Sequence, residues 1–135
     1  MKYLLDTHVL IWALTNDARL SAKIRDIILS PDNLISVSTA SLWEIAIKNQ
    51  KNPEKCPYHE RTINNYCREA GFSVMNITPE HIMSIRTLQT APDKYLSNLD
   101  PFDRLLTAQA KAEGFIILTH DINFRNYDET CILIF

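Results

Sequence analysis

Short apolar runs alternate with segments of helical character along the whole chain. Four runs are typical of buried strands, at residues 2–5, 34–37, 72–77 and 115–118, and a marginal fifth is expected at 131–135. Strands that alternate with helices predict an α/β fold with a mostly parallel sheet of four to five strands and right-handed crossovers. At 135 residues the chain predicts a single domain, residues 1–135, with one sizeable core.

Helices are expected between these runs, and several carry recognisable start and stop signals. Thr7 is a candidate cap for the first helix, and Thr78 followed by Pro79 is a strong start for the fifth. Gly71 and Gly114 are expected to end two helices. The helices are predicted at residues 9–14, 17–29, 38–48, 58–70, 79–88 and 100–113. Because the chain holds only two glycines, it contains neither a GxGxxG nor a Walker phosphate-binding loop.

The composition argues against some classes of function but does not identify one. A hydrophobic fraction of 46% and a charged fraction of 22% are ordinary for a soluble globular protein. A net charge of −2 gives no overall basic field, which argues against passive nucleic-acid binding. Three widely spaced cysteines without a CxxC pair argue against a zinc site or disulfides and favour the cytoplasm. No apolar run approaches the ~20 residues of a membrane span, so no membrane partner is expected.

Four acidic residues lie where an expected strand passes to a helix, or one or two turns into that helix. They are Asp6, Glu44, Asp103 and Asp121. Ligands of parallel α/β sheets bind at the carboxyl ends of the strands, so these side chains can converge there. Carboxylates that converge repel one another unless a cation lies between them, and an all-oxygen site suits Mg²⁺ or Mn²⁺. The pattern predicts a divalent-metal site and chemistry on phosphate esters.

Asp6 and Asp121 each also have a purely structural interpretation. Asp6 could cap the first helix, although Thr7 could cap it instead. Asp121 could be a turn residue. Thr119 could orient a carboxylate or a metal-bound water, or could be a core hydroxyl. Thr7 and Thr119 are therefore possible additional site residues.

Glu44 has two such alternatives. With Ser41 it fits an S-x-x-E capping box, which would hold its carboxylate at the start of its own helix. Ser38 offers a competing cap one turn earlier, which would leave Glu44 free. A pair with Lys48, four residues further on, is also possible.

The segment DPFD holds two acids whose roles must be separated. Asp100 is well placed as a helix cap, Pro101 as the first helical residue and Asp103 as the acid of the first turn. Both could therefore be structural. If only one binds metal, Asp103 is favoured, because capping occupies the side chain of Asp100. Asp100 is kept as a possible additional site residue.

Five segments together resemble the PIN-domain family, and within it the VapC-type toxins of bacterial toxin–antitoxin pairs: LLDTHVLIWAL, SVSTASLWEIAIK, ITPEH, DPFDRLLTAQA and ILTHD. The resemblance implies a three-layer α/β/α sandwich and a Mg²⁺- or Mn²⁺-dependent ribonuclease acting on tRNA or another structured RNA. It also implies a homodimer and a cognate antitoxin as partners. By position, four residues take the places of the family's acids, with Asp100 an extra acid of the DPFDR subgroup: Asp6, Glu44, Asp103 and Asp121.

Other features allow weaker expectations. The apolar helices around residues 9–14 and 45–47 suggest a dimer face or an antitoxin groove, and Trp12 and Trp43 are expected in the core or at a dimer contact. His8 and His120, next to two of the acids, could touch substrate or lie at a cleft rim. A loose basic stretch could guide an RNA backbone or be solvated surface: Lys48, Lys51, Lys55 and Arg61.

Three other classes of function compete with the ribonuclease. An aspartyl phosphotransferase of the dehalogenase type needs a second Asp two residues after the first, where this chain has His8. A receiver-type phosphotransferase needs a Lys at the end of a late strand, where Leu118 passes into Thr119. A PIN nuclease that acts on DNA and a catalytically silent PIN-fold binding module both remain open.

Overall fold

The computed structural model describes residues 1–135 and contains a five-stranded, wholly parallel sheet of order β3-β2-β1-β4-β5. This confirms the α/β class and the place of every expected strand. The strands are β1 (Lys2–Leu5), β2 (Leu34–Ser38), β3 (Ser73–Met75), β4 (Ile116–Thr119) and β5 (Ile132–Ile134).

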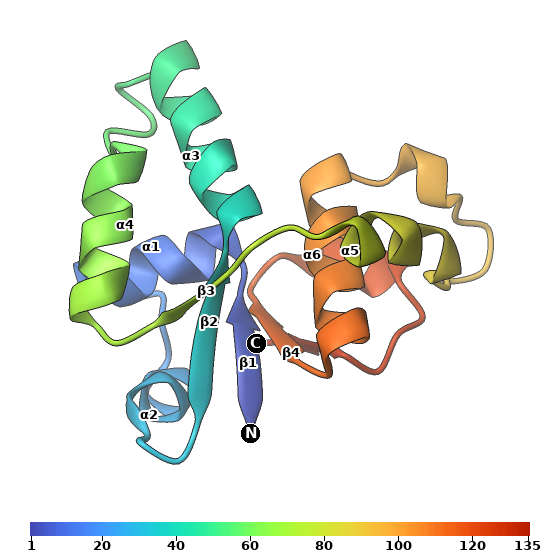
Figure 1. Ribbon diagram of the computed structural model, residues 1–135, viewed down its shortest axis with the longest axis horizontal. Helices are drawn as coiled ribbons and strands as arrows, with labels where there is room; N and C mark the ends of the chain where they lie inside the picture. Colours follow the sequence, from blue (N-terminus) through green and yellow to red (C-terminus); the bar gives the residue numbers. More distant parts are fainter.

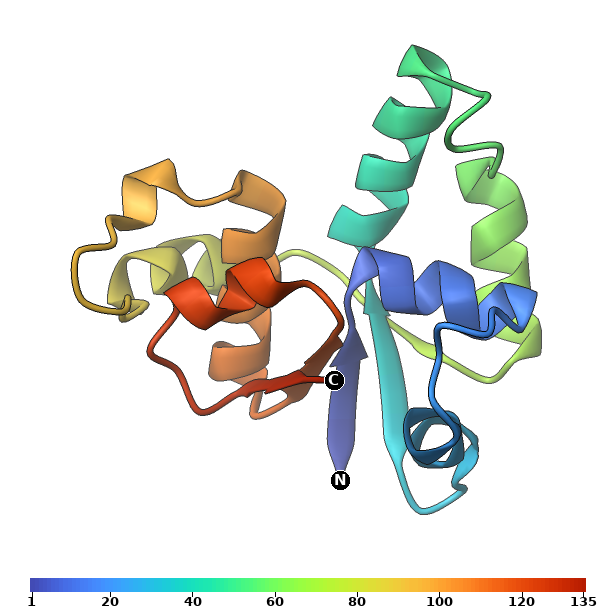
Figure 2. The same ribbon diagram turned by 180° about the vertical axis from the view of Figure 1, so that it is seen from behind.

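Helices cover both faces of the sheet, so the fold is the expected three-layer α/β/α sandwich. Figure 1 shows α1 to α4 on one side of the strands and α5 and α6 on the other, and Figure 2 shows the same layers from behind. The α-helices are α1 (Thr7–Thr15), α2 (Ala22–Leu29), α3 (Thr39–Lys51), α4 (Glu60–Glu69), α5 (Pro79–Ser84) and α6 (Pro101–Glu113). Three short 3₁₀ helices are η1 (Ile85–Thr87), η2 (Leu96–Asn98) and η3 (Ile122–Asn126).

Two apolar clusters, one on each face of the sheet, hold these layers together. In β1, Leu5 belongs to the cluster under α1 to α4, whereas its neighbour Leu4 belongs to the cluster under α6. The same alternation separates Leu118 from Ile117 in β4. Side chains alternate between the faces of a strand, and a strand buried on both faces is apolar throughout. This is why the sequence shows continuous apolar runs.

Some expected boundaries were wrong, each for a local reason. The helix expected at 17–29 begins only at Ala22, because Ser21 has extended backbone and caps it by accepting from the Ile24 amide. The helix expected at 79–88 ends as an α-helix at Ser84 and continues as the 3₁₀ helix η1. The helix ends expected at Gly71 and Gly114 were placed correctly. Both residues have a positive φ, 78° and 72°, a backbone conformation that favours glycine and ends a helix.

Most of the apolar surface of α1 and α3 is buried within this chain. Val9, Leu10 and Ile45 are fully buried in the core of this chain, while Ile47 is exposed. The sequence alone could not separate these residues, because the apolar run has no polar face. None of the helices combines the length and apolar character needed to cross a membrane.

Candidate functional site

The carboxyl ends of β1, β2 and β4 bring the expected acids to one edge of the sheet. β1 lies between β2 and β4, so the segments that leave these three strands begin side by side. A cleft of about 170 Å³ lies there and is lined wholly by polar residues. All four acids expected from the sequence line this cleft, and so does Asp100. The lining residues are Asp6, His8, Glu44, Lys48, Asp100, Asp103, Asp121 and Asn123.

Asp6 is the most buried of these acids and is held by two hydrogen bonds. Its side chain accepts from the Thr7 amide at Oδ1 and from the Thr119 hydroxyl at Oδ2, both at 2.8 Å. Asp6, and not Thr7, is therefore the cap of α1, and it lines the cleft as well. Burial raises the pKa of Asp6, and the bonds from Thr119 and Thr7 only partly offset this effect.

Asp121 likewise combines a turn role with a place in the cleft. Its carboxylate caps η3 by accepting from the Asn123 amide at 2.9 Å. Its own amide donates to the Thr119 hydroxyl oxygen at 3.0 Å. Thr119 therefore links the backbone of Asp121 to the carboxylate of Asp6, which agrees with its expected place as an orienting residue.

Glu44 reaches the cleft from the second turn of α3, held on both of its oxygens. The Thr7 hydroxyl donates to Oε1 at 2.6 Å, and the Lys48 ammonium lies 2.9 Å from Oε2. Ser38 caps α3 by accepting from the Ala40 amide, so the alternative capping box formed by Glu44 is absent. Burial lowers the pKa of Lys48, but the hydrogen bond and charge of Glu44 outweigh it and raise the pKa overall.

Asp100 and Asp103 separate as the sequence suggested. Asp100 caps α6 by accepting from the Asp103 amide at 3.0 Å. The carboxylate of Asp103 forms no hydrogen bond and no ion pair, although it is partly buried. Burial first, and then the charges of Asp6, Asp100, Asp121 and Glu44, together raise the pKa of Asp103 to about 8. Asp103 is thus the acid that most lacks a positive partner.

The donor set of this cleft fits a hard divalent cation. Five carboxylates line it, the only ammonium group on its wall is that of Lys48, and neither sulfur nor a buried imidazole is present. As the side chains stand, no three acidic, histidine or cysteine groups are arranged to hold an ion together. The two observations agree if few carboxylates bind directly, because Mg²⁺ is usually held by one or two carboxylates and keeps several waters.

Some residues of this region were missed or misplaced from the sequence. Asn123 lines the cleft, and Tyr127 lines an adjoining cavity of about 230 Å³ that also contains Asp103. The Tyr127 hydroxyl is buried without a hydrogen-bond partner. No sequence pattern marks either residue, because η3, which contains Asn123 and ends just before Tyr127, is too short to show a period. Trp12 is buried as expected, whereas Trp43 is 60% exposed, which excludes the core for it, and packs edge-on against Phe102.

Comparison with known proteins assigns the fold to a family. A model of the PIN domain matches residues 3–130 of the sequence. The chain belongs to the PIN domain family. The resemblance inferred from the sequence motifs is therefore confirmed at the level of the family. A comparison with curated protein sequences finds no match.

Solved structures share the fold of this PIN domain at low sequence identity. VapBC2 from Rickettsia felis, bound to a DNA fragment from its promoter, has a TM-score of 0.72 and 16% identity, covering 99% of this chain and 98% of that one. DNA-bound VapBC from Salmonella typhimurium has a TM-score of 0.68 and 18% identity, covering 99% and 98%. A functionally unknown protein domain from Methanocaldococcus jannaschii has a TM-score of 0.56 and 18% identity, covering 99% and 90%.

Proposed function

We propose that this PIN domain, a single domain of residues 1–135, is a Mg²⁺- or Mn²⁺-dependent endoribonuclease. The observation that carries the proposal is the cleft at the carboxyl end of the sheet, where five carboxylates meet and Asp103 lacks any partner. Such an arrangement is costly in the absence of a cation, because the carboxylates repel one another. Clusters of perturbed carboxylates are typical of catalytic sites.

The residues proposed to hold the metal, directly or through its bound waters, are Asp6, Glu44, Asp103 and Asp121. When bound, Mg²⁺ or Mn²⁺ would supply positive charge to a phosphodiester and activate water for its hydrolysis. Asp103 offers a carboxylate with no competing hydrogen bond, whereas Asp6 is already fixed in orientation. Asp100, whose side chain caps α6 and lines the cleft, is kept as a possible additional ligand.

The other residues of the cleft orient and neutralise these acids. Thr119 and the Thr7 amide hold the Asp6 carboxylate in one orientation, so binding a cation costs little rearrangement there. The Thr7 hydroxyl does the same for Glu44. Lys48 offsets part of the charge of Glu44 at Oε2, the oxygen that Thr7 does not contact.

The partners are proposed from the family resemblance and the similar folds. The motifs of this chain resemble VapC-type toxins, and the VapBC proteins named above share its fold. We therefore propose that the chain is the toxin of a toxin–antitoxin pair in the cytoplasm, acts on tRNA or another structured RNA, forms a homodimer and is bound by a cognate antitoxin. A small open reading frame next to its gene, encoding a DNA-binding protein, would support this assignment.

The test is cleavage of structured RNA and of DNA by the purified protein, each with Mg²⁺, Mn²⁺ or a chelator. We expect metal-dependent cleavage of RNA, no cleavage with chelator, and loss of cleavage in Asp6→Asn with the fold intact. Cleavage of DNA alone would replace RNA as the substrate. Absence of cleavage in every condition would leave a silent binding module and contradict the proposal.

A further inference from the structure

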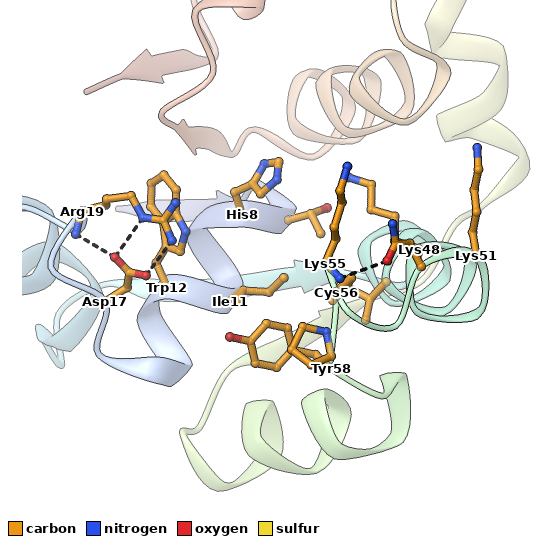
Figure 3. Close-up of a pocket in the computed structure, with 14 residues that line it drawn as sticks. His8, Ile11, Trp12, Asp17, Arg19, Lys48, Lys51, Lys55, Cys56 and Tyr58 are labelled. Carbon is orange, nitrogen blue, oxygen red and sulfur yellow. Dashed lines mark hydrogen bonds and ion pairs between the residues drawn. The ribbon is translucent and has the colours of Figure 1, made fainter.

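A third and larger cavity adjoins the acidic cleft. It has a volume of about 470 Å³ and lies between α1, α3 and the segment 52–58 (Figure 3). His8 and Lys48 line both cavities, so the two lie side by side. We call the larger cavity the basic groove and define its rim by four cationic residues, Arg19, Lys48, Lys51 and Lys55.

The basic groove has a charge opposite to that of the cleft beside it. Its wall carries four cationic side chains and one acid, Asp17, although the chain as a whole is acidic. Arg19 is bonded to Asp17 at 2.7 Å, and Lys48 is bonded to Glu44. Lys51 and Lys55 have no carboxylate within ion-pair distance. Two ammonium groups are therefore free to meet anionic groups of a ligand.

The floor of the basic groove is apolar and partly aromatic. Ile11, Ile45 and Tyr58 line it, and Tyr58 lies below the lysines in Figure 3. Arg19 covers the ring of Trp12, with its guanidinium carbon 4.6 Å from the ring centre. A ligand that fits must combine negative charge along one side with a flat or apolar face on the other. Nucleotides have this combination, and the volume lies within the range of ~300–1,000 Å³ typical of small-molecule sites.

We infer that the basic groove binds the stretch of RNA next to the scissile phosphate, as a single strand. Lys51 and Lys55 contact backbone phosphates, and an unstacked base lies against the floor at Tyr58. A base can reach an apolar floor only when it is unpaired and splayed out of a helix, which is the usual mode of RNA recognition by side chains. The inference rests on the proposed function, because it places the substrate of the acidic cleft.

Lysine substitutions in the basic groove separate substrate binding from the chemistry of the cleft. The variants are Lys51→Ala, Lys55→Ala and the double variant, with Lys23→Ala as the matched control. Lys23 is exposed on α2, far from the carboxyl end of the sheet (Figure 1). Two substrates are compared in Mn²⁺: an unpaired RNA oligonucleotide and bis(p-nitrophenyl) phosphate, a phosphodiester too small to reach both cavities.

We expect a several-fold rise in KM for RNA in each lysine variant, with kcat unchanged. We also expect a logarithmic salt dependence of kcat/KM that is shallower by about 0.7 for each backbone phosphate that no longer meets an ammonium group. Hydrolysis of the small diester should be unchanged in all variants, and Lys23→Ala should match the wild type on both substrates. The unpaired RNA should have a lower KM than a duplex of the same sequence.

The other outcomes each overturn a defined part of the account. RNA kinetics and salt slope that are unchanged in the double variant would overturn the inference and leave an acidic peptide as the occupant of the groove. A preference for the duplex would overturn the single-strand assignment. Cleavage of the small diester without cleavage of RNA would overturn the inference but keep the metal chemistry, and failure on both substrates would overturn the proposed function as well.

Discussion

The hydroxyl of Thr119 donates a 2.8 Å hydrogen bond to Oδ2 of Asp6 and so joins the end of β4 to the end of β1. Thr119 is completely buried, and Asp6 is only 5% exposed. Because the Thr7 amide holds the other oxygen of Asp6, the carboxylate has one fixed orientation. The geometry of the proposed metal site thus depends on a residue that is not itself expected to be a ligand.

Thr119→Val tests this relationship while keeping the size of the side chain. The variant loses the donor to Asp6, so we expect the free energy of unfolding of the metal-free protein to fall by about 1–3 kcal/mol. Affinity for Mn²⁺ should also fall, because the carboxylate is no longer oriented. Urea unfolding and Mn²⁺ titration measure the two effects. Thr130→Val, at an exposed threonine, is the control, and equal effects in both variants would contradict this role.

The raised pKa of Asp103 predicts an unusual pH dependence of stability. In the fold this pKa is about 8, against an ordinary value of 3.8, because of burial and then the neighbouring acids. Between these two pH values the folded protein retains a proton that the unfolded chain has released. The contribution of Asp103 to stability is therefore lost as pH rises from about 4 to about 8, and it changes little above that.

Asp103→Asn should remove this pH dependence, because asparagine does not ionise. In chelator at pH 8 we expect the variant to be more stable than the wild type, and at pH 4 the two should be close. Urea unfolding at several pH values measures the difference. Parallel curves for the two proteins would contradict the assigned pKa. Since metal binding requires the ionised carboxylate, activity of the wild type should rise towards pH 8.

Lys48→Met tests whether the Lys48 ammonium group supplies part of the positive charge that a metal cation would otherwise supply to the cleft. Removing it should strengthen Mn²⁺ binding by up to ~1 kcal/mol, since a half-exposed charge contributes little more than that. The same variant should raise KM for RNA, because Lys48 also lines the basic groove. Lys48→Arg keeps the charge and is the control. Weaker Mn²⁺ binding in Lys48→Met would show that Lys48 supports the metal site instead.

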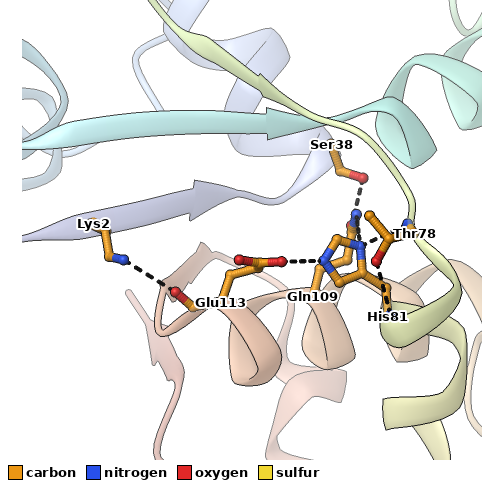
Figure 4. Close-up of polar contacts among 6 residues, drawn as sticks. All are labelled: Lys2, Ser38, Thr78, His81, Gln109 and Glu113. Carbon is orange, nitrogen blue, oxygen red and sulfur yellow. Dashed lines mark hydrogen bonds and ion pairs between the residues drawn. The ribbon is translucent and has the colours of Figure 1, made fainter.

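A buried polar network joins α5, α6 and β2 (Figure 4), and none of its residues lines the cleft. His81 Nδ1 accepts from the Thr78 amide at 3.1 Å and lies 3.3 Å from Gln109 Nε2. Because Nδ1 is the acceptor, the other ring nitrogen of His81, Nε2, donates to the Glu113 carboxylate at 2.7 Å. The Ser38 hydroxyl donates to Gln109 at 2.6 Å. Ser38, His81 and Gln109 are almost wholly buried, so each depends on these partners.

Gln109→Leu breaks this network and should affect stability alone. Ser38 and His81 each lose a hydrogen-bond partner, so we expect a loss of about 1–3 kcal/mol in the free energy of unfolding. The kcat of the folded variant at saturating metal should match that of the wild type. Glu113→Gln, at a half-exposed side chain that still accepts a hydrogen bond, should cost less. A fall in kcat for Gln109→Leu would mean that the network reaches the cleft.

The fold and the acid cluster could be predicted because local signals carried them. Continuous apolar runs mark strands buried on both faces; Asp6 directly follows one such run, and Asp121 lies just past another. The cap at Asp100 and the acid at Asp103 could be separated from the sequence alone, because capping leaves a fixed spacing. Whether these acids bind metal remains a prediction.

Other features depended on contacts between distant segments. The bond from Thr7 to Glu44 joins residues 37 positions apart, and no local pattern indicates it. Trp43 was expected in the core or at a dimer contact, because the apolar stretch around it has no clear polar face. The structure excludes the core and leaves Trp43 on the surface, with its ring against Phe102 of another helix, so a dimer contact stays a prediction. The basic stretch expected from the sequence also separates in the structure: its three lysines line the basic groove, but Arg61 does not.

Mn²⁺ binding followed by electron paramagnetic resonance tests most directly whether the clustered carboxylates share a divalent cation. The wild type should bind Mn²⁺ saturably, and both Asp6→Asn and Asp103→Asn should lose most of that affinity while remaining folded. Asp93→Asn, at an exposed residue with φ of 63° that asparagine also tolerates, should bind like the wild type. Equal Mn²⁺ binding by all four proteins would contradict a metal centre in this cleft.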